Sequence, residues 1–250
     1  MAQAISLQRD FSPAMPCYGQ LLRLREHPPM PSEPVLRPMT VADIPAGLAL
    51  CRAAGWNQLE ADWRRILQQG DATVAEQDGI VIGSVAVLHY PQWDWVAMLL
   101  VSPDARGRGV GTLLLSHALS ASGRVVGLDA TPEGRRVYLK HGFVDDFEIR
   151  RLEGITPGGA TGELPPMRSG YLAQHIGPII APDDETAWTM LRSVPSGQRV
   201  FLDVPVVHTD WLDSLRGIGF EERRRLIRMW RPAPPDEAEI PHAIEGPEFG

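Results

Sequence analysis

The sequence has few cysteines, no surplus of basic residues and no long apolar segment. It contains two cysteines, Cys17 and Cys51, at a spacing typical of no metal site, so a disulfide framework is not expected. The formal net charge of −7 argues against a general nucleic-acid-binding protein. No apolar run approaches the roughly 18 residues that span a bilayer, and no secretion signal is recognised. We therefore expect a cytoplasmic globular protein, a monomer or homodimer, without nucleic-acid or membrane partners.

The most distinctive segment is an arginine- and glycine-rich loop between an apolar strand and a helix. It reads Val101-Ser-Pro-Asp-Ala-Arg-Gly-Arg-Gly-Val-Gly-Thr112. Such a loop leaves several backbone N–H groups unpaired at the start of a helix, where the helix dipole also favours an anion. Two arginine side chains lie beside these groups. The segment therefore predicts a pyrophosphate-binding loop.

Two other phosphate-binding motifs fit this loop less well. Gly107-x-Gly109-x-x-Thr112 partly matches the dinucleotide fingerprint, and Asp129 follows at about the distance of a ribose-binding acid. The third glycine is displaced, however, and the preceding strands form a hairpin instead of opening a βαβ unit. A nucleotide P-loop is excluded because no Gly-Lys-Ser/Thr follows.

The periodicity of apolar residues predicts a chain that alternates between helices and strands. The segment 95–101 is almost wholly apolar and is expected to be a central strand. Strands are predicted at 35–38, 73–77, 80–90, 95–101, 125–129 and 143–152, and helices at 40–54, 59–69, 110–122 and 134–141.

The second half of the chain echoes the first. Arg124-Val125…Leu128-Asp129…Gly142-Phe143 is matched by Arg199-Val200…Leu202-Asp203…Gly219-Phe220. In the echo, the acidic segment 181–185 replaces the glycine-rich loop, so we expect one phosphate-binding site and not two. The predicted organisation is a Pro-rich arm (1–33), a first domain (34–153), a linker (154–169), a smaller degenerate domain (170–232) and a tail (233–250).

Several motifs together resemble the GNAT acyl-CoA N-acyltransferase superfamily. They are Arg106-x-x-Gly109-x-Gly111 after Val101-x-Pro103, and Tyr138-x-x-x-Gly142-Phe143. The segments 55–58 and 128–134 resemble the bacterial subgroup with a second, GNAT-like C-terminal domain. This resemblance implies an α/β (α+β) fold whose mixed, mostly antiparallel sheet is flanked by helices. It also implies a metal-free acetyl-CoA-dependent transfer of an acetyl group to the amine of a small molecule by direct attack.

The resemblance also implies how acetyl-CoA is held. A bulge in the central strand opens a slot in which Leu99, Leu100 and Val101 pair with the pantetheine arm, and an N–H near Leu99 faces the thioester carbonyl. Thr131 replaces an asparagine that contacts this arm in many relatives. By the same resemblance, the pyrophosphate is bound by the loop residues Arg106, Gly107, Arg108, Gly109, Val110, Gly111 and Thr112.

Tyr138 is the strongest catalytic candidate, because a phenol is protonated at neutral pH and can donate to a departing thiolate. Its alternative role is packing of a helix on the sheet. Asp94 and Asp129 are candidate general bases. Alternatively, Asp94 is a solvated acid in a loop, and Asp129 caps the turn that follows it. If Asp94, Asp129 and Asp203 together make an acidic cleft, a cationic amine fits best.

Aromatic and polar residues are candidates for the wall of the acceptor pocket, or alternatively for the core. They are Trp56, Asn57, Trp93 and Trp95. The run Glu221–Arg225 is most simply a solvated strand face, and no histidine spacing predicts a metal ligand. The competing function is a non-catalytic acyl-CoA-binding sensor or partner module.

Overall fold

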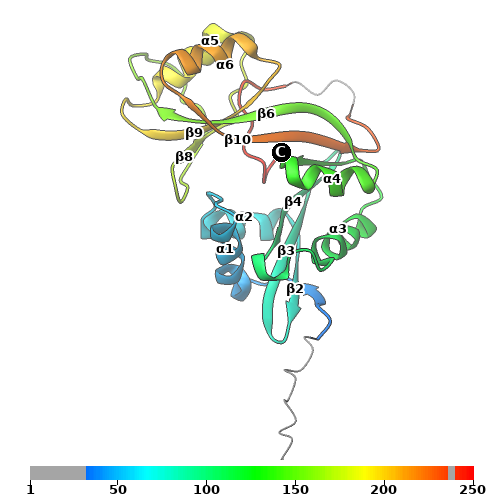
Figure 1. The fold of residues 1–250 in the computed structure, drawn as a ribbon. Coiled ribbons are helices and arrows are strands. Elements are labelled where there is room, and N and C mark those ends of the chain that lie inside the picture. Colours follow the sequence, from blue (N-terminus) through cyan, green and yellow to red (C-terminus); the bar gives the residue numbers. More distant parts are fainter. Residues whose placement is uncertain (1–31, 236–239) are drawn as a thin grey trace, which may run out of the picture. The chain divides into compact units, whose positions relative to one another are not determined.

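A ten-stranded mixed sheet forms the centre of the computed structural model, which describes residues 32–235 and 240–250 (Figure 1). Most of the predicted arm, 1–33, lies outside the described residues. Neighbouring strands are antiparallel except for the pairs β4–β5 and β8–β9. The strand order is β1 (Val35–Pro38), β2 (Gly70–Gln77), β3 (Ile80–His89), β4 (Asp94–Val101), β5 (Val126–Ala130), β10 (Glu221–Arg231), β6 (Val144–Ile155), β9 (Arg199–Pro205), β8 (Gln174–Ile176) and β7 (Met167–Arg168).

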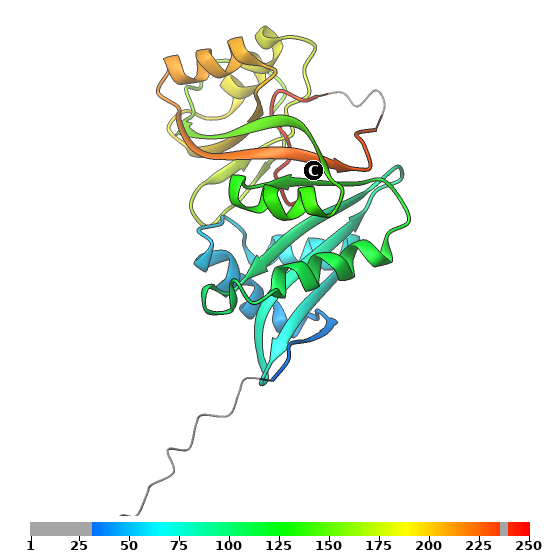
Figure 2. The same ribbon diagram turned by 45° about the vertical axis from the view of Figure 1, so that its right-hand side comes forward.

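Helices cover both faces of the first half of this sheet (Figure 2). Strand alternation explains the two layers: Ala86 and Leu88 of β3 pack with the first helix pair, while Val85 and Val87 pack on the opposite face. The first pair is α1 (Ile44–Ala53) and α2 (Glu60–Gln69), and the second is α3 (Val110–Ala121) and α4 (Pro132–Lys140). In the second half, α5 (Asp184–Ser193) and α6 (Thr209–Gly217) pack on β9 and β6.

The elements predicted for the first half are all present, with boundaries displaced by a few residues. The apolar strand β4 lies between β3 and β5, as its composition indicated. The helix predicted at 40–54 begins as a short 3-10 turn, Val41–Asp43, before α1. No helix of the described ranges has both the length and the apolar character needed to cross a membrane.

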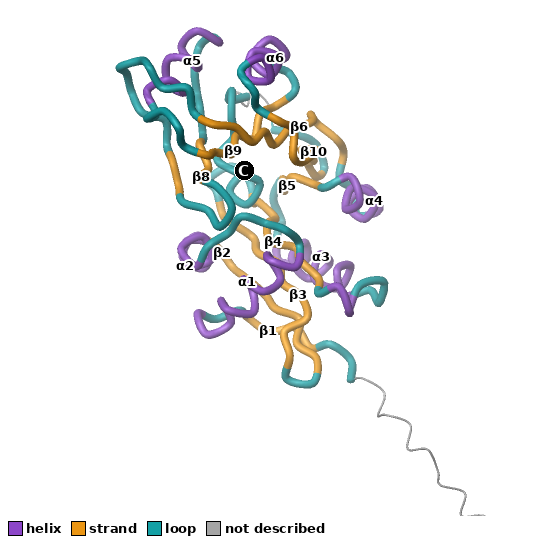
Figure 3. Tube along the Cα trace, turned by 60° about the vertical axis from the view of Figure 1, so that its left-hand side comes forward, coloured by secondary structure: helices purple, strands orange, loops and turns teal. Residues whose placement is uncertain are grey.

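The two halves exchange their last long strands. Strand β10 from the second half lies between β5 and β6, and β6 from the first half lies between β10 and β9 (Figure 3). Each half is thereby completed by a strand from the other. The described part of the chain accordingly forms one compact unit.

The internal repeat is visible in matching hydrogen bonds. After α4, Phe143 N donates to Tyr138 O at 3.2 Å, and after α6, Phe220 N donates to Leu215 O at 3.1 Å. Gly142 and Gly219 both adopt the left-handed conformation, with φ of 83° and 95°. The repeat therefore places Leu215 where the first half has its phenol.

Residues 240–250, the described part of the predicted tail, are packed into the fold. Ala243 bridges to Ile179, and Ile244 N donates to Asp203 O at 2.9 Å. Farther on, Trp95 Nε1 donates to Pro247 O at 3.0 Å. This terminal segment thus contacts both halves of the fold. Its apolar residues Ala243, Ile244 and Phe249 and its charged residue Glu248 are buried.

Candidate active site

The arginine- and glycine-rich loop presents free backbone donors at the start of α3. None of the N–H groups from Gly107 to Thr112 donates to another backbone group in the described ranges. Gly107 and Gly109 have φ of 72° and 84°, which a side chain would strain. This geometry can bind an anion through the backbone.

Strand β4 carries a bulge and then separates from its parallel neighbour β5. Met98 has a φ of 52°, and its carbonyl accepts a hydrogen bond from Ser84 Oγ at 2.9 Å. Strands β4 and β5 pair at Asp94↔Val126 and Trp95↔Gly127, and this pairing stops before the bulge. The strands therefore leave an opening on the side that faces the loop.

A cavity of about 660 Å³ connects this opening with the loop. Its lining includes residues of β4, the first turns of α3 and α4, and the start of β10. The predicted site residues that line it are Trp56, Leu99, Val101, Arg106, Gly107, Gly109, Val110, Gly111, Thr112, Asp129, Thr131 and Tyr138. The cavity volume and its mostly apolar wall suit a small-molecule site.

Tyr138 is half-buried on α4, and its ring meets Phe143 edge-on at 5.9 Å between centroids. Burial raises the pKa of Tyr138 to about 12, so the phenol stays protonated at neutral pH. At the start of the same helix, Thr131 Oγ1 accepts a hydrogen bond from Gly134 N at 3.2 Å. Thr131 is therefore the helix cap, a role that the sequence had left open for Asp129.

Asp129 is held by an arginine from the second half. Both of its oxygens accept hydrogen bonds from Arg228, each at 2.9 Å, and its side chain is fully buried. Burial raises the pKa of Asp129, and Arg228 opposes that rise. A carboxyl group in this state is a more basic proton acceptor than an exposed aspartate.

The repeat makes a second pair of the same kind. Asp203 accepts hydrogen bonds from Arg151 at 2.8 and 2.6 Å, and both side chains are buried. Burial raises the pKa of Asp203, but the adjacent Arg151 outweighs it and holds the pKa below its usual value. Asp203 does not line the cavity, whereas Arg151 does.

Asp94 lies away from the cavity. Its carboxylate contacts His89 Nδ1 at 2.9 Å and accepts from Ser122 Oγ at 2.6 Å, and it lines a separate, smaller cavity. With Asp129 and Asp203 each neutralised by an arginine, the three acids do not form an acidic cleft. The basis for expecting a cationic amine is therefore lost.

Four further predicted residues have other surroundings. Leu100 belongs to the core beneath α1 and α2, and Trp93 lines a third cavity with Trp230. Asn57 is buried, and its side chain fixes the loop at 172–173 through hydrogen bonds to backbone groups. The Arg108 guanidinium donates to Gln77 at 3.0 Å and does not line the cavity.

The cavity also contains charged residues that the sequence reasoning missed. Glu248, from the terminal segment, is buried and pairs with Arg168. Arg224 was assigned to a solvated strand face, yet it lines the cavity because alternate residues of β10 point to opposite sides. The repeat could have revealed Arg151, which follows Phe143 by the same interval as Arg228 follows Phe220.

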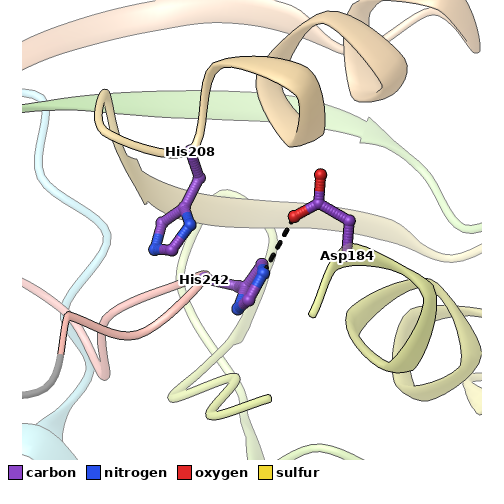
Figure 4. A group of neighbouring side chains, drawn as sticks. All are labelled: Asp184, His208 and His242. Carbon is purple, nitrogen blue, oxygen red and sulfur yellow. Dashed lines mark hydrogen bonds and ion pairs between the residues drawn. The ribbon is translucent and has the colours of Figure 1, made fainter. Parts of the chain in front are cut away.

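A histidine pair anchors the terminal segment to the second half (Figure 4). His242 Nε2 and Asp184 Oδ1 are 2.9 Å apart, and the His208 ring stacks on His242 with centroids 4.2 Å apart and planes 19° apart. Nitrogen lone pairs lie in the ring planes, so one ring would have to turn before both histidines could bind one ion. We interpret the group as a hydrogen-bonded anchor.

Comparison with known proteins gives matches to two family models that share one description. Residues 68–145 match one model and residues 167–240 match the other; both models are described as acetyltransferase (GNAT) domain, and the matches together cover more than half of the chain. A structure from Pyrococcus horikoshii, provisionally assigned as an acetyltransferase, superposes with a TM-score of 0.73. It covers 88% of this chain and 96% of its own, at 17% identity, and so supports the fold.

Two curated relatives are similar in sequence. The holothin acyltransferase of a Pseudoalteromonas species is 26% identical over 68% of this chain and 78% of its own length. The amino-acid acetyltransferase of Ralstonia nicotianae is 39% identical over 32% of this chain, which is 20% of that longer protein. With its two matched segments and its acyltransferase relatives, the chain belongs to the GNAT acyltransferase family and carries two GNAT domains in tandem.

Proposed function

We propose that this protein transfers an acetyl group from acetyl-CoA to the amine of a small molecule by direct attack. The observation that carries the proposal is the continuity of one cavity. It joins the free amides of the loop, the opening beside the β4 bulge, the Tyr138 phenol and two buried carboxylates. A non-catalytic acyl-CoA-binding module would need the loop, but it would not need the Tyr138 phenol and the buried carboxylates at the other end of the cavity.

The residues present fit the donor. Backbone N–H groups from Gly107 to Thr112 would bind the pyrophosphate, and Arg106 would add a positive charge at the mouth of the cavity. The pantetheine arm would lie beside Leu99 and Val101, where β4 has lost its pairing with β5. A backbone N–H near Leu99 would then donate to the thioester oxygen as it gains charge.

The reacting bonds require a proton acceptor and a proton donor. As the amine nitrogen bonds to the acyl carbon and the carbon–sulfur bond breaks, the nitrogen would lose its second proton to the departing thiolate, directly or through water, while Tyr138 would donate a hydrogen bond to that sulfur. Asp129 would take the proton of the acceptor ammonium, directly or through water. Its raised pKa favours that role, while Arg228 fixes its orientation. Trp56 would form part of the acceptor wall.

Thiol release from acetyl-CoA over a panel of small amines tests this proposal. We expect amine-dependent thiol release that the Gly109→Val variant loses, because a β-branched residue is strained at a φ of 84°. Gly123→Val is the matched control, since Gly123 is exposed with open space around it. CoA binding without thiol release to any amine would refute the enzymatic assignment and support the binding module.

A further inference from the structure

Arg224 places an additional positive charge in the cavity, away from the phosphate-binding loop. It lies on β10 three residues before Ile227, whose partner Ala130 is the last residue of β5. The guanidinium is 5.7 Å from the centre of the Trp56 ring, and it donates to Gly55 O at 3.3 Å. Arg224 thus lies at the end of the cavity that contains Trp56, where β10 extends beyond the last residue of β5. We call this the acceptor end.

The other buried charges at this end are already paired. Asp129 binds Arg228, Asp203 binds Arg151, and Glu248 binds Arg168, which also pairs with Asp62. Arg224 forms no ion pair with any residue in 32–235 or 240–250, and its one polar contact given above is a neutral carbonyl. Burial, and then the nearby Arg151, lower the pKa of Arg224. An anionic ligand in the cavity would give the Arg224 guanidinium the direct ion pair that it lacks among these residues.

The register of the sheet strengthens this argument. Arg224 is directly opposite Arg151 in the β10–β6 pair, and both side chains line the cavity. Like charges at directly opposed positions destabilise a sheet, so this pair is unfavourable without a negative group nearby. Asp203 forms an ion pair with Arg151, whereas Arg224 has no ion-pair partner among the described residues and is influenced by Glu248 and Glu133 only through space.

We propose that Arg224 binds a carboxylate of the acceptor, and hence that the substrates are small amines that also carry a carboxylate. The guanidinium would hold the carboxylate against Trp56, while the amine lies toward Asp129 and Tyr138 in the same cavity. This inference rests on the proposed function and specifies its substrate class. It replaces the expectation of a cationic acceptor.

Matched substrates test the inference. Acetylation rates of amino acids are compared with those of their α-amides, for the wild type, Arg224→Gln and the control Arg223→Gln. Arg223 is the exposed neighbour that pairs with Glu153 on the other side of the strand. We expect the wild type to prefer the carboxylates, and Arg224→Gln to raise their KM roughly 10- to 100-fold, as for the loss of a hydrogen bond to a charged group. Arg223→Gln should change neither the preference for carboxylates nor their KM.

Direct binding separates this inference from the proposed function. N-acetyl amino acids and their amides are titrated against the CoA-bound protein, and thermal unfolding confirms that each variant is folded. Carboxylate binding that depends on Arg224, without any turnover, would refute the transfer reaction but support the anion site. Equal binding of acids and amides, or an unchanged preference in Arg224→Gln, would overturn the inference. Arg224→Lys keeps the charge and should retain part of the preference.

Discussion

Replacing Tyr138 with phenylalanine removes a single hydroxyl group from the cavity. The ring keeps its edge-on contact with Phe143, so the fold and CoA binding should be preserved. The change therefore isolates the contribution of the phenol to the chemical step.

The pKa of Tyr138 sets the expected size of the effect. Burial raises that pKa to about 12, whereas an ordinary thiol has a pKa of about 8.5. Complete proton transfer to such a thiolate would be uphill by roughly 3.5 pKa units, or about 5 kcal/mol. A hydrogen bond to a charged group is worth about 1.5–3 kcal/mol. We therefore expect kcat to fall roughly 10- to 150-fold, and not by the roughly 10⁴-fold upper limit of general acid catalysis.

The assay is steady-state thiol release at saturating acetyl-CoA, with CoA affinity measured separately by calorimetry. Tyr171→Phe serves as the control, because Tyr171 is exposed and does not line the cavity. A fall of less than about threefold would refute any catalytic role of the phenol. A fall beyond roughly 10³-fold would refute the hydrogen-bond argument, because it would require full proton transfer.

Three other perturbations test the loop, the packing and a buried histidine. Gly109→Val should weaken CoA binding roughly 10²-fold in calorimetry, about the loss of one hydrogen bond to a charged phosphate. Gly127→Ala should lower the free energy of unfolding in urea by roughly 1–3 kcal/mol, because the added Cβ would lie 2.5 Å from the rings of Trp95 and Trp230. Burial lowers the pKa of His175 to about 4. Below pH 6.5 the unfolded chain therefore binds a proton that the native protein does not, and stability should fall by up to about 3 kcal/mol toward pH 4.

Each of these expectations has an outcome that contradicts it. CoA affinity unchanged in Gly109→Val would exclude the loop as the pyrophosphate site. Gly123→Ala is the control for Gly127→Ala, and equal stability of the two variants would contradict the packing argument. For His175, denaturant unfolding is compared with that of His175→Gln between pH 7 and 4.5. The same pH slope in both proteins would mean that other groups cause it.

Local patterns were sufficient to predict the first half and its loop. The glycine spacing at 107–111, the apolar strand β4 and the Tyr138…Gly142-Phe143 motif are all contiguous or nearly so in sequence. The charged residues that complete the acceptor end could not be predicted in this way. Arg224 and Glu248 reach it only because β10 inserts beside β5 and the terminal segment folds back. Neither contact can be predicted from a periodic pattern in the sequence.

The exchange of strands has a consequence for synthesis on the ribosome. Strand β5 is complete at Ala130, but its antiparallel neighbour β10 ends at Arg231, roughly a hundred residues later. At about 5–20 residues per second, the edge of β5 stays open for roughly 5–20 s in each nascent chain. An open strand edge is a site for pairing with other chains, so this interval is when the protein is most vulnerable to aggregation. Slowing translation between β5 and β10 should therefore reduce its soluble yield.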